Sequence, residues 1–324
     1  MSKVISSKYN NNWGHNTNPF ITIITPVYNR RNTIQRAIRS VEQQVFRNIE
    51  YIIIDDGSTI SSDDIIERYM SESDLPVAYI KKENGGVHTA RNVGYDYARG
   101  EMIICLDSDD ELTADACELF YRAWNDIPKE IRTEFWQIKA LCVDEKGNLS
   151  GNRFPENINI LSHNEANKYF SGGEGEQLGC RLTSILKDNK FPEPPDIKFV
   201  NEVILWLPLE MKYRSWGTND IVRIYHTEGN DHLTGGKGQK SIQSCLNALW
   251  NSAYELNHAS VYIKSKKRHA SILLRYCIME QILRIKKKDF SKDFKIKSIK
   301  DNIGRILLMA PSIIGAYVYI NKRM

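Results

Sequence analysis

Residues 83–110, which read ENGGVHTARNVGYDYARGEMIICLDSDD, decide the fold class of this chain. A turn with two glycines leads into a helical pattern over 87–98, and a continuous apolar run at 102–106 then ends on aspartates. A short apolar run bounded by turn residues is typical of a strand that is buried on both faces. The stretch therefore predicts a loop, a helix and a buried strand, which together form the repeating unit of an α/β fold.

The same alternation extends outward from this stretch, from residue 20 to about residue 125. Apolar runs of strand length occur at 21–25 (where Pro26 is expected to end the strand), 51–55 and 77–81, with helical patterns between them. We therefore predict a Rossmann-like, mostly parallel sheet flanked by helices. The strands end in TPVYN, DDGST, KKENGG and DSDD. Because the carboxyl ends of parallel strands meet at one edge of a sheet, these loops are expected to form one ligand site.

The composition is that of an ordinary folded protein, with 324 residues, 41% hydrophobic and 26% charged. A formal net charge of +4 gives no reason to expect a nucleic-acid partner. The six cysteines lie apart without CxxC spacing, which is typical of reduced thiols in the cytosol. Residues 1–19 are polar and lack the apolar core of a secretory signal, so we expect a flexible lead-in.

The last part of the chain, residues 236–324, is expected to be helical, with Lys and Arg concentrated in 264–300. The apolar stretch from Ile306 to Ile320, about fifteen residues, is too short to span a bilayer. A basic region before an apolar tail favours a helix that lies in the membrane surface. A tail packed on the domain is the alternative, and a nucleic-acid surface is disfavoured because the segment lacks a regular interleaving of aromatic and basic residues.

Three segments keep their order and spacing along the chain: ITPVYNRRNTIQRAIRSVEQQ, YIIIDDGST and ENGGVHTARNVGYDYARGEMIICLDSDD. Together they resemble the N-terminal half of a family 2 glycosyltransferase with the GT-A fold, over about residues 20–125. The resemblance implies a GT-A domain over 20–235, with a nucleotide-sugar half at 20–125 and an acceptor half at 126–235. The helical appendage at 236–324 follows, and its apolar tail is a candidate for membrane association.

In such a domain the strand-end loops bind a nucleotide sugar. The resemblance implies that Asp56 pairs with a uracil ring and that Asp55 is structural, with an Asx-type turn as the alternative for both. Tyr28 is suited to stack on the base, and Gly86 allows close backbone approach. Arg91 is a forked donor for phosphate oxygens or, alternatively, a surface helix cation. The residues implied to bind the nucleotide sugar are Thr25, Pro26, Tyr28, Asp56, Gly86, Arg91, Asp107 and Asp109.

The DSDD loop is the predicted metal site. A divalent cation, Mn²⁺ or Mg²⁺, held by carboxylates would neutralise the diphosphate as it leaves. The resemblance makes Asp109 the direct ligand and places Asp107 nearer the ribose or a metal-bound water. Asp110 is a third ligand or, alternatively, the cap of the following helix. His226 matches a histidine that contacts the metal or the diphosphate, and a structural role is its alternative.

The general base is expected near the start of a helix in the acceptor half. FVNEVILWLPL, residues 199–209, occupies the place where the family usually has a Glu-Asp pair before a Trp and a Leu. Asn201 and Glu202 stand there instead, so Glu202 takes the base position although its side chain is longer than aspartate. A first-turn carboxylate favoured by the helix dipole is the alternative. Glu174 and Glu176 are competing bases or residues that position the acceptor.

These features predict an inverting, metal-dependent glycosyltransferase that moves a hexose or N-acetylhexosamine from a UDP-sugar and forms a β linkage. The acceptor is expected to be a polyprenyl-diphosphate-linked sugar or glycan in cell-surface polysaccharide synthesis, such as O-antigen or capsule. We expect a peripheral protein on the cytoplasmic face of the inner membrane. The alternative is a non-catalytic nucleotide-sugar-binding or scaffold protein. A nucleotidyltransferase ranks last because TPVYNRRN lacks the glycines of a phosphate loop. The oligomeric state stays open.

Overall fold

The computed structural model describes residues 3–15, 17–155, 160–161, 175–226, 241–259, 265–290, 294–308 and 312–316. The chain divides into two compact units. The first comprises Met1–Glu193 and Leu209–Glu228, and the second comprises Pro194–Pro208 and Gly229–Met324. The segment Pro194–Pro208 thus groups with the C-terminal helices, whereas the predicted division at residue 235 assigned it to the GT-A domain. The domain boundary itself stays a prediction.

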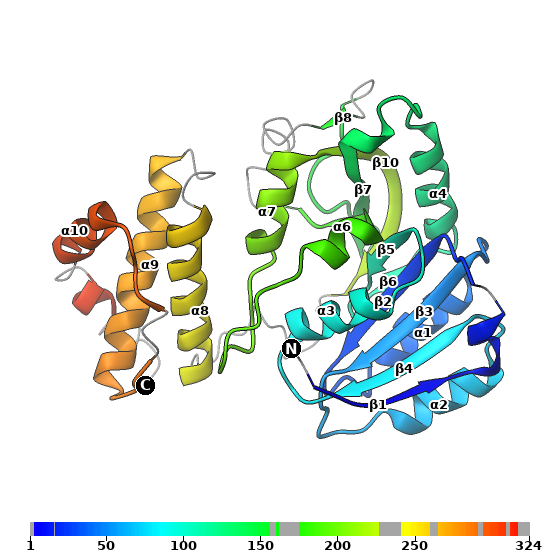
Figure 1. Cartoon of the computed structure of the whole chain (residues 1–324), viewed down its shortest axis with the longest axis horizontal. Coiled ribbons are helices and arrows are strands. Elements are labelled where there is room, and N and C mark those ends of the chain that lie inside the picture. The colour runs from blue at the N-terminus through cyan, green and yellow to red at the C-terminus, as the bar shows by residue number, and fades with distance from the viewer. Residues whose placement is uncertain are drawn as a thin grey trace. The chain divides into compact units, whose positions relative to one another are not determined.

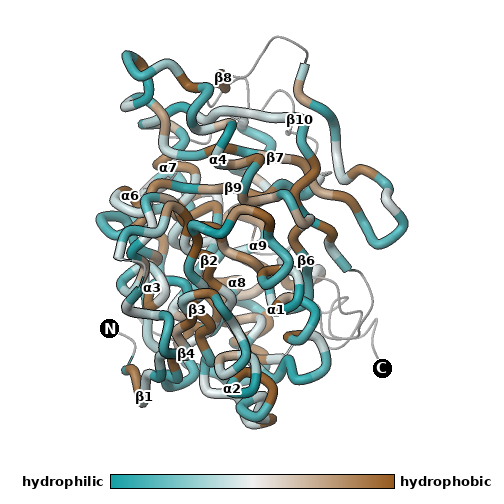
Figure 2. The backbone as a smooth tube through the Cα atoms, turned by 90° about the vertical axis from the view of Figure 1, so that its right-hand side faces the viewer, coloured by the Kyte–Doolittle hydropathy of each residue, from teal (hydrophilic) through white to brown (hydrophobic). Residues whose placement is uncertain are grey.

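A parallel four-stranded sheet forms the centre of the first unit (Figure 1). Its strands, in spatial order, are β4 (Val77–Lys82), β3 (Ile49–Asp55), β2 (Ile21–Val27) and β5 (Met102–Cys105). Every residue of β2 and β3 is buried, and hydrophobic residues concentrate along these strands in Figure 2. Isoleucine-rich runs of this kind suit a sheet that is covered on both faces. The predicted α/β fold with a mostly parallel central sheet is confirmed.

Helices cover both faces of this sheet. They are α1 (Ile34–Glu42), α2 (Asp63–Glu72), α3 (Val87–Tyr97) and α4 (Ala116–Asp126). The buried face of α1 joins one core cluster together with Ile23, which points to one side of β2. Its neighbour Ile24 points to the other side, as successive strand residues do, and packs against α3 at Gly94. A Cβ at Gly94 would lie 2.6 Å from Ile24 Cγ2, so only glycine allows this close approach.

Beyond β5 the sheet continues with mixed strand directions. The added strands are β9 (Gln177–Leu182), β7 (Phe135–Asp144), β10 (Arg214–Tyr225) and β6 (Glu111–Leu112), with β8 (Ile160–Leu161) paired to β10. β9 is antiparallel to both β5 and β7, and β10 is parallel to β7. Since β6 follows the DSDD loop and pairs with the end of β10, the chain around residue 225 lies beside that loop.

Pro26 does not end the first strand of the parallel sheet, contrary to the prediction. β2 continues to Val27 and pairs with β3 along its whole length, including Pro26 opposite Ile54. On its other side, pairing with β5 ends at Ile24. A proline lacks the N–H that a central ladder needs. Pro26 fits because its strand has only one neighbour at that point.

The prediction of a flexible lead-in is wrong for the described residues of that segment. Val4–Tyr9 form β1, which pairs antiparallel with β4 at the edge of the sheet. Asn10 follows and accepts a hydrogen bond from Val77 N at 3.0 Å. The Arg99 guanidinium then lies 3.8 Å from the centre of the Trp13 ring. Polar side chains are compatible with an edge strand, because most of β1 faces solvent.

The second unit contains the helices α8 (Ile242–Tyr254), α9 (Lys266–Ile285) and α10 (Ile299–Leu307). α10 packs on α9 through its polar side: Arg305 forms an ion pair with Glu280, and Asp301 contacts His269 at 2.6 Å. The helices that the structure describes include none with the length and apolar character needed to cross a membrane.

Candidate active site

The first two strand-end loops are tied together by Asn29. This residue has a φ of 54°, which is left-handed backbone that asparagine tolerates better than most residues. Its Oδ1 accepts hydrogen bonds from the backbone N–H groups of Thr59 at 2.8 Å and Ile60 at 2.9 Å. Its own N–H donates to Ser58 Oγ at 3.0 Å. The TPVYN and DDGST loops therefore form one rigid edge, as the parallel sheet predicts.

Asp56 ties the third loop to the same edge. Its carboxylate is buried and pairs with Lys82 Nζ, and it accepts the N–H groups of Gly85 at 2.9 Å and Gly86 at 2.7 Å. Asn84 Nδ2 donates to it as well, at 3.2 Å. A carboxylate offers about four acceptor positions, so all are used within the protein. Asp56 therefore holds the loop between β4 and α3. Its pairing with uracil stays a prediction, because one of these hydrogen-bond donors would first have to release the carboxylate.

The buried pair of Lys82 and Asp56 is expected to dominate the stability of this loop. Both side chains are almost fully buried, at 0% and 3% exposure, so Lys82→Met leaves a buried carboxylate without its cation. Breaking such a pair costs about 3–5 kcal/mol of unfolding free energy, which urea denaturation followed by circular dichroism measures. Lys81→Met is the matched control, because its ion pair with Asp63 is about one-third exposed and is worth about 1 kcal/mol or less. Equal losses in both variants would contradict this assignment.

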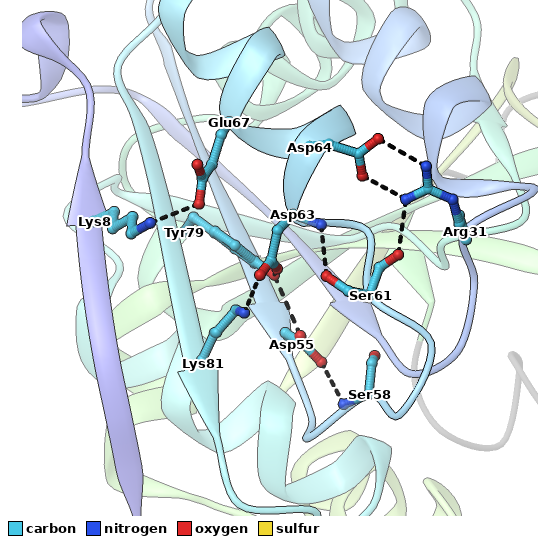
Figure 3. Close-up of polar contacts among 10 residues, drawn as sticks. All are labelled: Lys8, Arg31, Asp55, Ser58, Ser61, Asp63, Asp64, Glu67, Tyr79 and Lys81. Atoms are coloured by element: carbon cyan, nitrogen blue, oxygen red, sulfur yellow. Dashed lines mark hydrogen bonds and ion pairs between the residues drawn. The ribbon is translucent and has the colours of Figure 1, made fainter.

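A second network fixes the DDGST turn against α2 (Figure 3). Tyr79 OH donates to Asp63 Oδ1 at 2.7 Å and lies 3.2 Å from Asp55 Oδ2, while Asp55 Oδ1 accepts Ser58 N at 2.8 Å. Partial burial raises the pKa of Asp63, but the Lys81 ammonium and the Tyr79 hydroxyl outweigh it and hold that pKa below its ordinary value. Asp55 thus stabilises the turn, in keeping with the structural role predicted for it.

Four residues predicted to bind the nucleotide sugar lie in β2, just after it, and at the start of α3. Thr25 is buried and accepts a hydrogen bond from Tyr51 OH at 3.0 Å, so its hydroxyl supports the sheet. Pro26 is buried in β2. Tyr28 is 46% exposed, which leaves its ring accessible for stacking on a ligand. Gly86, at the start of α3, has a φ of 99°, a conformation that favours glycine.

The DSDD loop contains two accessible carboxylates, each beside an arginine. Arg91 donates to Asp107 Oδ1 at 3.1 Å, and Arg30 lies 3.7 Å from Asp109 Oδ2. The side chains of Asp107 and Asp109 are 43% and 23% exposed. The structure therefore brings Arg91, Asp107 and Asp109 together, as predicted, and adds Arg30, which the sequence analysis missed.

Asp110 differs from its two neighbours because it is buried. Its carboxylate lies 3.4 Å from Arg223 NH1 and accepts the backbone N–H of His226 at 3.2 Å. Burial raises the pKa of Asp110 to about 7, although the Arg223 guanidinium opposes this rise. The predicted alternative, a helix cap, is wrong, since α4 starts at Ala116 and Asp115 occupies its N-cap position.

Arg223 connects this loop to Glu176. Its guanidinium lies between Asp110 and Glu176, whose Oε2 it approaches at 2.6 Å. The sequence analysis missed Arg223, and the signal for it was a single arginine within an apolar strand. Glu176, one of the competing bases, thus belongs to the edge that carries the DSDD loop. Glu174 lies outside the described residues.

His226 reaches the same edge but faces a different partner. Its Nε2 lies 2.7 Å from Glu111 Oε1. Among the described residues, no three His, Cys, Asp or Glu side chains are grouped to hold a metal ion. The structure therefore does not unite His226 with Asp107 and Asp109 in one ligand set, and its metal role stays a prediction.

The two accessible aspartates nevertheless fit a metal that is held jointly with a phosphorylated ligand. Mg²⁺ is typically bound by one or two carboxylates together with substrate phosphates, whereas a structural cage needs more protein ligands. Asp107 and Asp109 supply two carboxylates, and Arg30 and Arg91 provide positive charge for phosphate oxygens beside them. This donor set favours a site that is completed by a diphosphate.

Glu202 precedes α7 (Val203–Lys212) and belongs to the second unit. Its Oε2 accepts a hydrogen bond from Trp206 Nε1 at 3.0 Å. The preceding residue, Asn201, accepts Val203 N at its Oδ1 at 3.1 Å, which satisfies a free N–H at the helix start. Glu202 is therefore held in one orientation by the tryptophan of its own helix, and its role as a base stays a prediction.

Comparison with known proteins identifies relatives of this chain. Residues 22–145 match the family model described as Glycosyl transferase family 2. The chain is 27% identical over 316 residues to the GalNAc(5)-diNAcBac-PP-undecaprenol beta-1,3-glucosyltransferase of Campylobacter jejuni, covering 91% of this chain and 94% of that protein. It is also 26% identical to the putative teichuronic acid biosynthesis glycosyltransferase TuaG of Bacillus subtilis, covering 66% of this chain and 82% of that protein.

The fold has counterparts among solved structures. The crystal structure of Staphylococcus aureus TarS residues 1–349 in complex with UDP-GlcNAc matches with a TM-score of 0.55 and 18% identity. The match covers 92% of this chain and 79% of that one. Another crystal structure of TarS residues 1–349 matches with a TM-score of 0.53 and 17% identity, covering 92% of this chain and 80% of that one. At this level of identity, the likeness concerns the fold.

Proposed function

We propose, for a chain that belongs to glycosyltransferase family 2, that it transfers a hexose or N-acetylhexosamine from a UDP-sugar to a lipid-linked glycan. The observation that carries this proposal is the pairing of Asp107 and Asp109 with Arg91 and Arg30 at the strand-end edge. This edge offers both the carboxylates and the guanidinium groups that a metal-bound diphosphate requires. The protein is a glycosyltransferase, and the identity of its donor and acceptor is our proposal.

The acceptor is inferred from the relatives. The Campylobacter protein is named for an acceptor joined to undecaprenol through a diphosphate, and TuaG for the biosynthesis of teichuronic acid. These names support a role in the synthesis of a cell-surface polysaccharide. We propose that this glycan is an O-antigen or a capsule and that the chain acts on the cytoplasmic face of the inner membrane.

Each residue has a separate task in the proposed reaction. Arg30 and Arg91 bind phosphate oxygens, while Tyr28 stacks on the base. Asp107 and Asp109 would hold Mn²⁺ or Mg²⁺, and such a cation stabilises the negative charge of a departing diphosphate. Glu202 accepts the proton of the acceptor hydroxyl as that hydroxyl attacks the anomeric carbon. Attack on the face opposite the leaving diphosphate inverts the anomeric centre, so a sugar that is α-linked in the UDP-sugar donor ends in a β linkage.

Association with the membrane is supported by the apolar surface of the C-terminal segment. Three residues of α10 on one face, Ile303, Ile306 and Leu307, are 56%, 68% and 75% exposed. The polar side of this helix faces α9 instead, through Arg305 and Asp301. An amphipathic helix with its apolar side outward is typical of a surface that enters the membrane interface.

Replacing Ile306 and Leu307 together with serine is expected to reduce binding to anionic vesicles about a hundredfold. Burial of each large aliphatic side chain contributes about 1.5–3 kcal/mol, so losing two costs about 3 kcal/mol or more. Vesicle co-sedimentation measures the change. The matched control replaces two exposed isoleucines of the first unit, Ile5 (63%) and Ile60 (56%), with serine and should bind as the parent does. If the α10 variant binds vesicles as strongly as the parent, this apolar surface is excluded as the membrane-binding site.

A panel of UDP-sugars, tested with Mn²⁺ and with Mg²⁺ in the presence of a polyprenyl-diphosphate-linked sugar, tests the proposed function. Transfer or slow hydrolysis of at least one donor is the expected result. The Asn201–Glu202 pair, in place of Glu-Asp, favours one alternative, a non-catalytic nucleotide-sugar-binding protein of an assembly complex. That alternative predicts UDP-sugar binding in calorimetry without transfer or hydrolysis. If the chain neither binds nor turns over any UDP-sugar, the proposed transferase function and the non-catalytic alternative are both excluded.

A further inference from the structure

The second unit contains an open surface cavity of about 410 Å³, within the size range of small-molecule sites, and its polar lining side chains are mostly exposed. Three of its lining residues are basic, namely Lys267, Arg268 and Arg275. Two serine hydroxyls, those of Ser265 and Ser271, contribute donors beside them. The lining is therefore mostly hydrogen-bond donors, a chemistry that matches a phosphorylated ligand.

The cavity carries an excess of positive charge. Arg275 is held in place, because its Nη2 lies 2.9 Å from Glu255 Oε1 and its Nε donates to Ser252 Oγ at 2.9 Å. Within the described part of the chain, neither Lys267 nor Arg268 has a carboxylate at ion-pair distance. Among the described carboxylates, Glu255 therefore balances one of the three cations, and Lys267 and Arg268 supply the positive charge that a phosphorylated ligand would contact.

The start of α9 adds to this charge. The helix has 20 residues, its first turn contains no acidic residue, and Lys266, Lys267 and Arg268 occupy that turn. Cations at the positive end of a helix dipole are unfavourable for the free protein. The N–H of Arg268 already donates to Ser265 Oγ at 3.2 Å. A bound anion reverses the unfavourable effect, since it interacts favourably with the basic side chains and with the positive end of the helix dipole.

The cavity includes the residue that precedes the candidate base, which acts on the acceptor hydroxyl in the proposed reaction. Asn201 lines the cavity and directly precedes Glu202, the candidate base. Asn251 Oδ1 accepts the backbone N–H of Asn201 at 2.7 Å, which attaches this segment to α8. The donor residues Asp107 and Asp109 belong to the other unit. We propose that this cavity binds the diphosphate group of the lipid-linked acceptor, an inference that rests on the proposed function.

Binding of two soluble probes to the full chain tests this site. The probes are inorganic pyrophosphate and farnesyl diphosphate, measured by calorimetry with EDTA present so that no metal bridges them to the aspartates. The double variant Lys267→Ala with Arg268→Ala is expected to weaken the binding of each probe about tenfold or more. It removes two cations, and hydrogen bonds between a cation and a phosphate are stronger than those between neutral groups. Lys286→Ala with Lys288→Ala is the matched control, since it removes two exposed charges near the end of the same helix, outside the cavity.

A transfer assay then places the site in the reaction. The Lys267/Arg268 variant is expected to raise the KM for a polyprenyl-diphosphate-linked acceptor about tenfold while leaving the KM for the donor and the circular dichroism spectrum unchanged. Unaltered probe binding and acceptor KM in a variant that still transfers sugar would overturn this proposal alone. Loss of binding to phosphatidylglycerol vesicles with intact binding of both diphosphates would also overturn it, since it would identify a lipid-headgroup surface. Absence of transfer in the parent chain would instead count against the proposed function.

Discussion

Replacing Asp109 with alanine is expected to abolish measurable binding of a UDP-sugar and to lower transfer about a thousandfold or more. Asp109 presents a partly exposed carboxylate to Arg30 at 3.7 Å, in the loop that directly follows β5. A divalent cation held there would stabilise diphosphate charge by several kcal/mol, and each 1.36 kcal/mol corresponds to a factor of ten. Calorimetry with UDP and Mn²⁺ measures binding separately from turnover.

Asp115→Ala is the control for the Asp109 variant. Asp115 is an exposed aspartate shortly after the same loop, and its Oδ1 accepts a hydrogen bond from the hydroxyl of Thr113 at 2.9 Å. It lies outside the proposed donor site, so its loss should leave UDP binding unchanged. If UDP and Mn²⁺ bind equally well to the Asp109 variant and to the parent, the DSDD loop is not the diphosphate site.

Glu202→Gln is expected to leave donor binding intact and to lower kcat about 10²–10⁴-fold, the usual contribution of a general base. Glutamine retains an oxygen that accepts the Trp206 Nε1 hydrogen bond, observed at 3.0 Å with glutamate. The geometry of the helix start should therefore persist while the ability to take a proton is lost. Single-turnover transfer, measured beside UDP-sugar calorimetry, separates these two effects.

Glu176→Gln distinguishes the competing base. Glu176 is bound to Arg223 at 2.6 Å on the edge that carries the DSDD loop, whereas Glu202 belongs to the second unit. A normal kcat for the Glu202 variant combined with a strongly reduced kcat for the Glu176 variant would move the base to Glu176. If kcat falls only in the Glu202 variant, Glu202 is the base and Glu176 has a positioning role through its contact with Arg223.

The parallel sheet was predictable because its strands are buried on both faces and read as continuous apolar runs. The first strand shows the limit of this signal, since Pro26 ends an apolar run but not β2. The N-terminal strand shows another limit. Its residues are mostly exposed and polar, and they form a strand because their backbone pairs with β4 at the edge of the sheet. Edge pairing depends on a partner that is distant in the sequence, so a local pattern does not reveal it.

The aspartate loop was also predictable as a group but not residue by residue. Asp107, Asp109 and Asp110 follow one strand, and their number and position in the sequence indicate an anionic cluster at the end of that strand. Which of them stays accessible depends on Arg223, contributed by β10 more than one hundred residues later. Burial beside that arginine separates Asp110 from the two carboxylates that face solvent.

The sequence by itself indicated the resemblance to family 2 glycosyltransferases, the α/β class and the loops of the candidate site, because these depend on local hydrophobic runs and on motifs in a constant order. Only the tertiary structure decided that Lys82 neutralises Asp56, that Arg223 joins Asp110 to Glu176, and that Pro194–Pro208 groups with the C-terminal helices. These features are contacts between charges from separate elements or the packing of distant segments. Their energies depend on distance and burial, which are properties of the folded chain and not of any single stretch.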